Sequence, residues 1–537
     1  MNTARPTLRS TALRPVFSLL FVGVLLGCAE RPAGPAWSAP NSNEVATIDG
    51  AERIAQWLGG IGTPANDHRR TELAWQRRDA QAPAVALVQG GTWALLASTL
   101  GGRNALLLMG GLVALSTLIL VICFAYRRFG ALPAFVSGVL LVLSPGFVGQ
   151  VFACGPEPYL GLSLILLCGG VRAARDGRLG GLPAALALAF AVVVTPLGVL
   201  FIIPLYLDES LRRGPSEDRS AGLISLPPLP LYPVLGVALG VALLVALWPW
   251  LRVQTGSRLL EYMIAPHLAP HPPLLLFGRV FDQATGAAPP LWTAALFWLV
   301  RLPPLLLLLA VFGLVGPART NDGTTGTRDL RLPLLLLATL FVVHSLSGSP
   351  WYDGVDGIVP LLPLLALGAA GGVARLRVLI ERRWQRRPLV VPAGVVLIVA
   401  CALVSRLMAG SVDAVYMNAF VGGPAGAAAL GLQLKPALGL DPPVISALNE
   451  KLPARARVML APETATLHRL ARRLTGEGVL REDLRFEEGE EVDYLVLLFD
   501  PARSLPDALR DVFDTRTPTS VVSHRGVPLA KIFLSED

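Results

Sequence analysis

The segment "RRFGALPAFVSGVLLVLSPGFVGQVFACGPEPYLGLSLILL" (127–167) indicates the fold class of this chain. It opens on two arginines, continues through an apolar run, turns through a short loop that contains Glu157, and enters a second apolar run. A hydrocarbon core about 30 Å thick needs roughly 20 apolar residues per helix, so the two runs predict a pair of transmembrane helices. Arginines at one end and none in the opposite loop indicate two sides of a membrane.

The composition of the whole chain agrees with this interpretation. Of its 537 residues, 53% are hydrophobic and 16% are charged, and the mean hydropathy is +0.56. A soluble protein needs a more charged surface, whereas lipid surrounds the apolar faces of a membrane protein. The net charge of +8 comes mainly from arginines in short loops between apolar runs, which is a topology signal. We therefore expect membrane lipids as partners and no nucleic acid.

Similar apolar runs recur along the chain. We predict a polytopic α-helical protein with about eleven spans, near residues 15–28, 104–126, 131–152, 158–172, 179–194, 196–207, 230–250, 291–316, 332–347, 358–374 and 388–408. Arginine-rich loops, densest at 375–387, alternate with loops such as 347–357 that hold neither lysine nor arginine. This asymmetry predicts an N-terminus inside and a C-terminus outside.

The expected organisation has four parts: an N-terminal transmembrane helix or signal anchor (1–28), an outside loop with interfacial helices (29–103), a transmembrane bundle (104–408) and a small soluble α/β domain outside (409–537). The first part is either a retained helix or a lipoprotein-type signal that ends at Cys28; we favour the retained helix, and both place the next loop outside. In the last part, strand-like runs at 456–462 and 493–499 flank a helical run at 467–478.

The first outside loop contains the stretch "NEVATIDGAERIAQWLGG" (43–60), in which Asp49 and Glu52 are the acids of interest. An acid at Asp49 and another at Glu52, ahead of an amphipathic run, form the spacing of a helix N-cap. A carboxylate at the membrane surface can also act as a general base for a hydroxyl nucleophile. The residues alone leave both interpretations open. Glu157, in the next acidic loop, is either a third catalytic candidate or a solvated turn residue.

The order and sidedness of these motifs resemble the membrane glycosyltransferases of the GT-C class. Within that class they are similar to the bacterial relatives of the protein O-mannosyltransferases (glycosyltransferase family 39) and of the aminoarabinose transferases. Besides the opening segment, the resemblance rests on "SLSGSPWYDGVDGIVPLLPLLAL" (345–367) and "VYMNAFVGGPAGAAALGLQLKPALG" (415–439). As a pattern it covers roughly residues 45 to 460.

The resemblance implies a reaction at the outer face of the bacterial inner membrane. A sugar would move from a polyprenyl-phosphate donor to a hydroxyl of a glycan, lipid or protein acceptor, with inversion. Asp49 would be the general base, and Glu52 would mainly cap the surface helix. The leaving phosphate needs cations, and the candidates are Arg258, Arg279, His267 and His271 in the second outside loop. The alternative is that the two arginines are solvated or bind lipid headgroups and that the two histidines cap the loop backbone.

No cofactor is expected, and a divalent cation is left open. His267 and His271 are four residues apart, but Pro270 and Pro272 break the helix that would aim both rings at one metal. We therefore predict no metal site at these two histidines.

The sequence also departs from the family pattern. The adjacent acidic pair of the family is split here by Gly50 and Ala51, the stretch 81–87 lacks a histidine, and the stretch 193–199 lacks a basic residue. These departures keep a non-catalytic or transport-type protein of lipid-linked sugar or envelope assembly as the alternative. A transporter is disfavoured because we find no internal repeat and the acids lie in loops.

Overall fold

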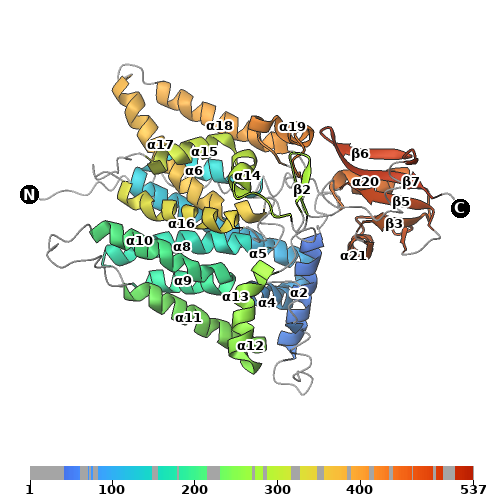
Figure 1. Ribbon diagram of the computed structural model, residues 1–537, viewed down its shortest axis with the longest axis horizontal. Coiled ribbons are helices and arrows are strands. Elements are labelled where there is room, and N and C mark those ends of the chain that lie inside the picture. The colour runs from blue at the N-terminus through green and yellow to red at the C-terminus, as the bar shows by residue number, and fades with distance from the viewer. Residues whose placement is uncertain are drawn as a thin grey trace, which may run out of the picture.

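The computed structural model describes residues 42–60, 71, 74–75, 83–147, 155–177, 181–213, 230–268, 273–281, 287–315, 327–346, 356–383, 389–409, 416–434, 440–462, 464–487, 492–499 and 515–535. Long helices lie side by side in a bundle, helix α2 crosses one end of it, and a sheet with two helices lies beyond that end (Figure 1). The predicted first helix and Cys28 lie outside the described residues.

The α-helices, in chain order, are α2 (Ser42–Gly59), α4 (Pro83–Leu100), α5 (Gly102–Phe129), α6 (Ala131–Val142), α8 (Glu157–Arg175), α9 (Leu182–Val194), α10 (Ile202–Arg213), α11 (Leu231–Leu247), α12 (Pro249–Val253), α13 (Thr255–Leu268), α14 (Thr293–Arg301), α15 (Pro304–Val315), α16 (Thr327–Ser345), α17 (Leu361–Arg383), α18 (Val390–Ala409), α19 (Gly423–Ala429), α20 (Pro442–Lys451) and α21 (Thr464–Gly476). Short 3₁₀ helices are η4 (Pro196–Phe201), η7 (Asp356–Ile358) and η9 (Ala419–Val421).

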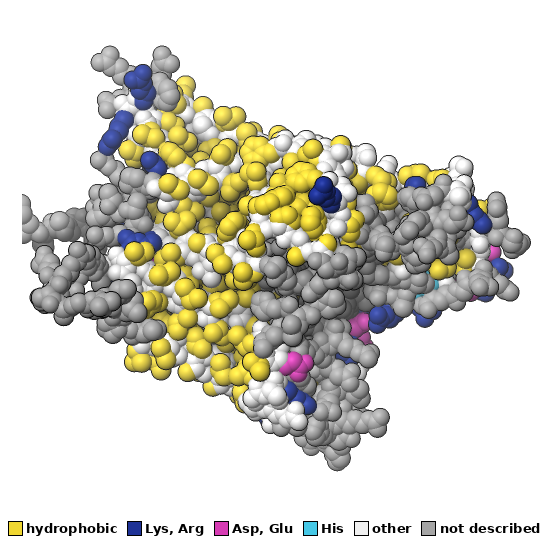
Figure 2. Space-filling view, viewed as in Figure 1, with side chains coloured by type: hydrophobic (Ala, Val, Ile, Leu, Met, Phe, Trp, Pro, Cys, Tyr) yellow, Lys and Arg dark blue, Asp and Glu magenta, His cyan; other side chains and the backbone are white. Residues whose placement is uncertain are grey.

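The bundle has the composition of a polytopic membrane protein. Among the described residues, four helices are long and apolar enough to span a bilayer, namely α4, α5, α17 and α18, and α14 with α15 forms a fifth candidate. Hydrophobic side chains cover much of the visible bundle surface (Figure 2). Exposed leucines and valines on α5, α11 and α18 suit lipid contact. This composition establishes several spans but not the predicted number. Helix α4, expected to lie at the membrane surface, meets the same criteria.

One predicted span is broken. We expected a single helix over 291–316, but α14 and α15 meet at an angle of 115°. Pro303 and Pro304 cause the break, because a proline provides no N–H for the helix ladder and disfavours helical geometry in the residue before it. Asn418 satisfies the backbone that the break exposes: its side-chain amide donates to the carbonyl of Leu302 at 2.8 Å, and its backbone N–H donates to that of Val300 at 2.8 Å.

Buried Arg301 completes this junction. Its guanidinium donates to the backbone carbonyls of Gln433 at 3.0 Å and Leu434 at 3.1 Å. The segment 416–434 is thereby tied to the broken span, and it packs with a hairpin of β1 (Leu274–Leu276) and β2 (Arg279–Phe281) in one apolar cluster. Backbone carbonyls and amide groups in a membrane protein need such internal partners because lipid offers none.

A second predicted span, 196–207, is not a single apolar helix in the structure. This stretch forms η4 and then α10, a helix that carries two acids and two arginines. Buried Asp208 on α10 forms an ion pair with Arg175 at the end of α8. Helix α10 lies toward the end of the bundle opposite α2 (Figure 1). Arginine pairs in the last turns of α5, α8 and α17 fit an arginine-rich side of the membrane.

Helices α15 and α17 pack closely through glycine. A Cβ atom on Gly313 would lie 2.0 Å from the carbonyl oxygen of Gly368, and one on Gly372 would lie 2.1 Å from that of Leu309. Backbones approach this closely only where side chains are absent, which is a common way to join helices in a membrane. The contact forms part of the main apolar core.

The C-terminal unit (440–535) is an α/β structure. Its sheet has the order β4-β3-β5-β7-β6, with β3 (Arg457–Ala461), β4 (Arg485–Phe486), β5 (Tyr494–Leu498), β6 (Ser520–His524) and β7 (Val527–Leu534). Strands β3, β4 and β5 are parallel, and β7 is antiparallel to both of its neighbours. Helices α20 and α21 share one apolar core with the sheet. The position of this unit outside the membrane stays a prediction.

The β6–β7 turn attaches the C-terminal unit to the last helix of the bundle. Arg525, in the left-handed region with φ of 50°, donates to the terminal carbonyls of Leu407 and Met408 on α18. A guanidinium suits this place, because the last carbonyls of a helix lack partners and carry partial negative charge. Val527 adds an apolar contact, since it belongs to the cluster around the hairpin and α14.

Candidate functional site

Helix α2 carries Asp49 across the end of the bundle (Figure 1). Its buried face consists of small and aliphatic residues, including Ile48, Ala51 and Ile54. Ile54 packs against Gly90 of α4, where an added Cβ would lie 2.4 Å from the Ile54 side chain. Ile48 and Ala51 share a cluster with Leu106 of α5. Packing on two bundle helices therefore fixes the depth and rotation of α2.

Asp49 forms an ion pair with the C-terminal unit. Arg473 on α21 donates from Nη1 to Oδ1 of Asp49 at 3.0 Å. Both side chains are partly exposed, Asp49 at 36% and Arg473 at 21%. Arg473 faces away from the core of its own unit, because Leu470, Ala471 and Leu474 fill that core. The pair thus joins the bundle end to α21.

Two further charges extend this pair. Nε of Arg473 donates to Oε1 of Glu477 at 3.2 Å, and Oε2 of Glu477 lies 3.6 Å from Nη1 of Arg103 at the start of α5. The sign of the charge alternates from Asp49 through Arg473 and Glu477 to Arg103. We call these four residues the ion-pair chain. Its two ends belong to the bundle and its two middle members belong to the C-terminal unit.

The end of α21 is held rigidly. The backbone N–H of Val479 donates to the carbonyl of Leu474 at 2.8 Å, across Gly478 with φ of 70°, a geometry that ends helices where a residue without a side chain can turn left-handed. Asn449 of α20 then donates to the carbonyl of Val479 at 3.0 Å. Arg473 and Glu477 lie just before this turn, so their backbone positions are well defined.

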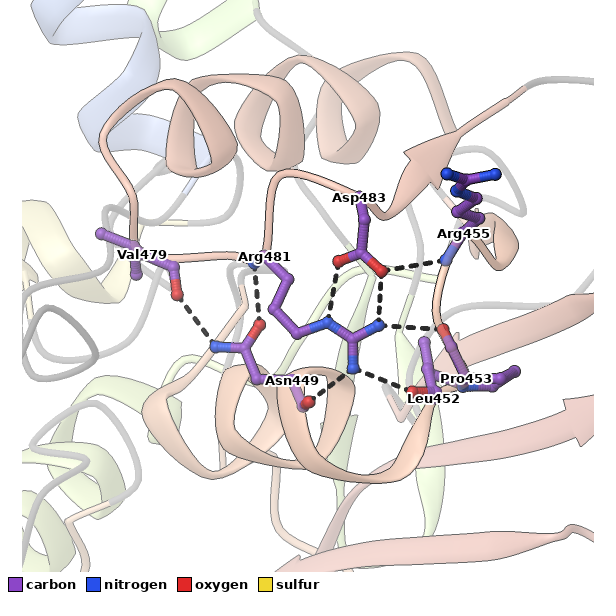
Figure 3. A network of polar contacts seen from close by, with 7 residues as sticks. All are labelled: Asn449, Leu452, Pro453, Arg455, Val479, Arg481 and Asp483. Atoms are coloured by element: carbon purple, nitrogen blue, oxygen red, sulfur yellow. Dashed lines mark hydrogen bonds and ion pairs between the residues drawn. The ribbon is translucent and has the colours of Figure 1, made fainter.

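Arg481 stabilises the loop that follows α21. Figure 3 shows its guanidinium between the carboxylate of Asp483 and the carbonyls of Asn449, Leu452 and Pro453, all at 2.9 Å. This hydrogen bonding by Arg481, with a further bond from the backbone N–H of Arg455, lowers the pKa of Asp483 to about 2. The network joins the α20–β3 turn to the loop after α21.

Glu52 does not cap the helix. Helix α2 begins at Ser42, before both acids, so Asp49 and Glu52 lie in its interior one turn apart. The expectation of an N-cap at this Asp-x-x-Glu spacing is therefore wrong, because the first turn and its open N–H groups lie elsewhere. Side chains three residues apart point to the same side of a helix. Glu52 is thus a second carboxylate beside Asp49, and it is partly buried.

Glu157 lies in the first turn of α8. Its carboxylate folds back over Gly155, where an added Cβ would lie 2.1 Å from Oε2. A carboxylate is favoured at this end of a helix because the first N–H groups carry partial positive charge. Glu157, a catalytic candidate or a turn residue by the sequence, is thus an acid at a helix N-terminus. Among the described residues, no hydrogen bond or ion pair joins Glu157 to Asp49.

The candidate phosphate ligands lie on two elements. Arg258 is partly buried in the first turn of α13. On the same helix, the ring of Tyr262 packs edge-on against that of Trp248, with ring centroids 5.2 Å apart. Arg279 is exposed on β2, in the hairpin whose Gly278 N–H donates to the carbonyl of Gly431 at 3.0 Å. His271 and the side chain of His267 lie outside the described residues. The structure therefore places Arg258 and Arg279 separately and does not test a shared phosphate site.

Several residues of the site were not predicted from the sequence. Arg473 and Glu477 belong to a run (467–478) interpreted only as a helix, and Arg103 was assigned only to a loop boundary. Asn418 was noted within a family-like segment without a role. Arg473 lies 424 residues from Asp49, and no local pattern connects positions so distant.

Comparison with known proteins shows the fold. The structure of ArnT from Cupriavidus metallidurans bound to undecaprenyl phosphate matches with a TM-score of 0.50 at 13% identity, over 98% of each chain. The apo form matches with a TM-score of 0.46 at 14% identity, over 97% of this chain and 98% of that one. An Archaeoglobus fulgidus oligosaccharyltransferase tethered with an acceptor peptide matches with 0.47 at 11% identity, over 89% of this chain and 64% of that one.

Sequence comparison adds no relatives, since no known family model and no curated protein matches the chain. The first structural match nevertheless spans nearly the whole length of both proteins. The resemblance to aminoarabinose transferases that the sequence predicts is thereby confirmed at the level of the fold: the chain has the architecture of ArnT.

Proposed function

We propose that the protein is a membrane glycosyltransferase that moves a sugar from a polyprenyl-phosphate donor to a hydroxyl of an outside-facing glycan, lipid or protein. The observation that carries the proposal is the fold match over the whole chain to ArnT, whose structure holds undecaprenyl phosphate. A lipid-linked donor is confined to the bilayer, so its sugar must react at the membrane surface. The bundle end crossed by α2 suits that surface, with the C-terminal unit on the periplasmic side of a bacterial inner membrane.

Asp49 is proposed as the general base. Its carboxylate is partly exposed at the bundle end, within reach of an acceptor that arrives from water. As the acceptor oxygen bonds to the anomeric carbon, Asp49 takes the hydroxyl proton, and the bond to the donor phosphate breaks with its electrons on the phosphate. Attack opposite the phosphate inverts the anomeric configuration. Glu52 and Glu157 are proposed as the next candidates for this role.

Arg258 and Arg279 are proposed to bind the donor phosphate, with His267 and His271 as further candidates. Arginine holds phosphate oxygens through paired N–H groups. Arg279 is well placed to meet a ligand, because it is exposed on a short hairpin at the same end of the bundle (Figure 1).

The test is a transfer assay with purified protein, radiolabelled polyprenyl-phosphate sugars and a panel of hydroxyl acceptors, with and without EDTA. Label should move to one acceptor class. Asp49→Asn should reduce turnover by about 10²- to 10⁴-fold, the usual contribution of positioned proton transfer, and should leave donor binding unchanged. Asp176→Asn is the matched control, since Asp176 is an exposed acid at the C-terminal end of α8, opposite to Glu157.

Each outcome discriminates between interpretations. Normal transfer by Asp49→Asn would exclude Asp49 as the base, and Glu157→Gln would then be the variant to examine. Wild-type protein that binds the labelled donor but releases no label to acceptor or water would support the non-catalytic alternative. Equal activity with and without EDTA would exclude a required divalent cation.

A further inference from the structure

The ion-pair chain brings the C-terminal unit directly to the proposed base. Arg473 contacts Asp49 through Oδ1 alone. Within the described part of the chain, Oδ2 of Asp49 has no hydrogen-bond partner. The two carboxylate oxygens therefore differ: one is held by a guanidinium, and the other is available at the partly exposed surface.

We propose that Arg473 is a positioning residue for the reaction: by holding Oδ1 of Asp49 it presents Oδ2 to the acceptor hydroxyl. The inference rests on the proposed function, because it assigns a partner to the proposed base. Oδ2 takes the acceptor proton, while the bond between Asp49 and Arg473 stays intact throughout the step. Arg473 touches neither donor nor acceptor in this role.

The remainder of the chain explains how Arg473 can hold a fixed geometry. Immobilising a long side chain at a surface costs conformational entropy, which is the loss that a fixed geometry must offset. Glu477 reduces that loss, because it engages Nε of Arg473 while Nη1 engages Asp49. Arg103 on α5 in turn neutralises Glu477 at 3.6 Å. Arg473 is therefore held from two sides and is not a free surface arginine.

The attachment of the C-terminal unit supports the same role. Arg525 and Val527 hold the unit against α18 and the hairpin cluster, and the Arg481 network holds the loop after α21. Arg473 thus extends from a framework that is attached to the bundle independently of Asp49. A framework that is attached to the bundle elsewhere and is braced internally can set the direction of the carboxylate, which a single flexible contact cannot.

The test compares Arg473→Gln with Arg472→Gln, which removes the same charge from the neighbouring, exposed position of α21. We expect Arg473→Gln to lower kcat by about 10- to 100-fold, the scale of misplacing a catalytic group. The KM for the donor should stay constant. Arg473→Lys should recover part of the loss, since it restores the charge but not the paired geometry. Arg472→Gln should match wild type.

Melting temperatures of the same variants separate positioning from folding. Exposed pairs contribute little to stability, so all three variants should melt close to wild type. A kcat for Arg473→Gln equal to that of Arg472→Gln would overturn the inference. A higher kcat would also overturn it, because it would show that Arg473 slows the reaction. A collapse of the melting temperature in Arg473→Gln alone would also overturn it, as a purely structural contact.

Failure of the inference and failure of the proposed function give different results. If wild-type protein transfers no sugar, the proposed function fails and this role for Arg473 fails with it. If wild type transfers sugar and Arg473→Gln does so equally well, only the role of Arg473 fails.

Discussion

Two aspartate–arginine pairs lie at opposite ends of this bundle, and their surroundings differ. Asp208 pairs with Arg175 where α10 meets α8, and its side chain is 2% exposed. Asp49 pairs with Arg473 where α2 meets α21, and its side chain is 36% exposed. The same two side-chain types therefore meet in a buried setting at one end and in contact with solvent at the other.

The difference in burial predicts a difference in role. A buried charge that loses its partner is costly, whereas an exposed one is solvated by water and loses little. The buried pair of Asp208 and Arg175, which we call the inner pair, should therefore be required for folding. The pair of Asp49 and Arg473 should contribute little to folding, so either side chain can be replaced without loss of the fold.

The largest effect should come from breaking the inner pair. We expect Arg175→Gln to destabilise the protein by about 3–5 kcal/mol, because buried Asp208 is left without its cation. Arg172→Gln, at an exposed position one turn earlier, should cost at most about 1 kcal/mol. Thermal unfolding in detergent measures both. Equal stability of the two variants would show that burial of the paired carboxylate does not set the cost of losing its arginine.

A smaller effect should follow from removing both inner charges together. Replacement of a buried pair by apolar residues of similar size is often close to neutral. The double variant Arg175→Met with Asp208→Leu should therefore recover most of the stability that Arg175→Gln loses. Single variants measured alongside give the coupling between the two positions. A double variant less stable than either single variant would show that the charges stabilise the fold directly.

The smallest effect should come from Asp483, which pairs with Arg481 and is 36% exposed, as Asp49 is. Its pKa of about 2 in the folded protein is below the usual 3.8, so the pair stabilises the fold above roughly pH 4 and loses this contribution as pH falls toward 2. The stability difference between wild type and Asp483→Asn should be present at pH 5 and vanish near pH 2. Denaturant unfolding at several pH values measures it. A difference that persists at pH 2 would contradict the assigned cause.

Local patterns in the sequence predicted much of the fold. The apolar run at 104–126 corresponds to α5 (Gly102–Phe129), and the strand-like runs at 456–462 and 493–499 correspond to β3 and β5. These elements were predictable because helices and strands repeat their apolar residues at different periods. The break between α14 and α15 was missed because apolar length alone suggested one span, although Pro303 and Pro304 marked the position.

The site was less predictable. Asp49 was chosen from its place in the first outside loop, but its capping role failed because the Asp-x-x-Glu spacing also suits one face of a helix interior. Its partner Arg473 is 424 residues away, and Arg103 and Glu477 likewise meet only in the folded chain. Contacts of this kind depend on how the C-terminal unit is attached to the bundle, which no local pattern encodes.

The junction between α14 and α15 also constrains how the protein is made. The carbonyl of Leu302 receives its hydrogen bond from Asn418, 116 residues later in the chain. A ribosome therefore releases the broken span into the membrane long before its partner has been synthesised. Helices α16, α17 and α18 must be synthesised first. Until then, water or the insertion machinery has to satisfy these carbonyls, so this junction should be among the last parts of the bundle to close during biogenesis.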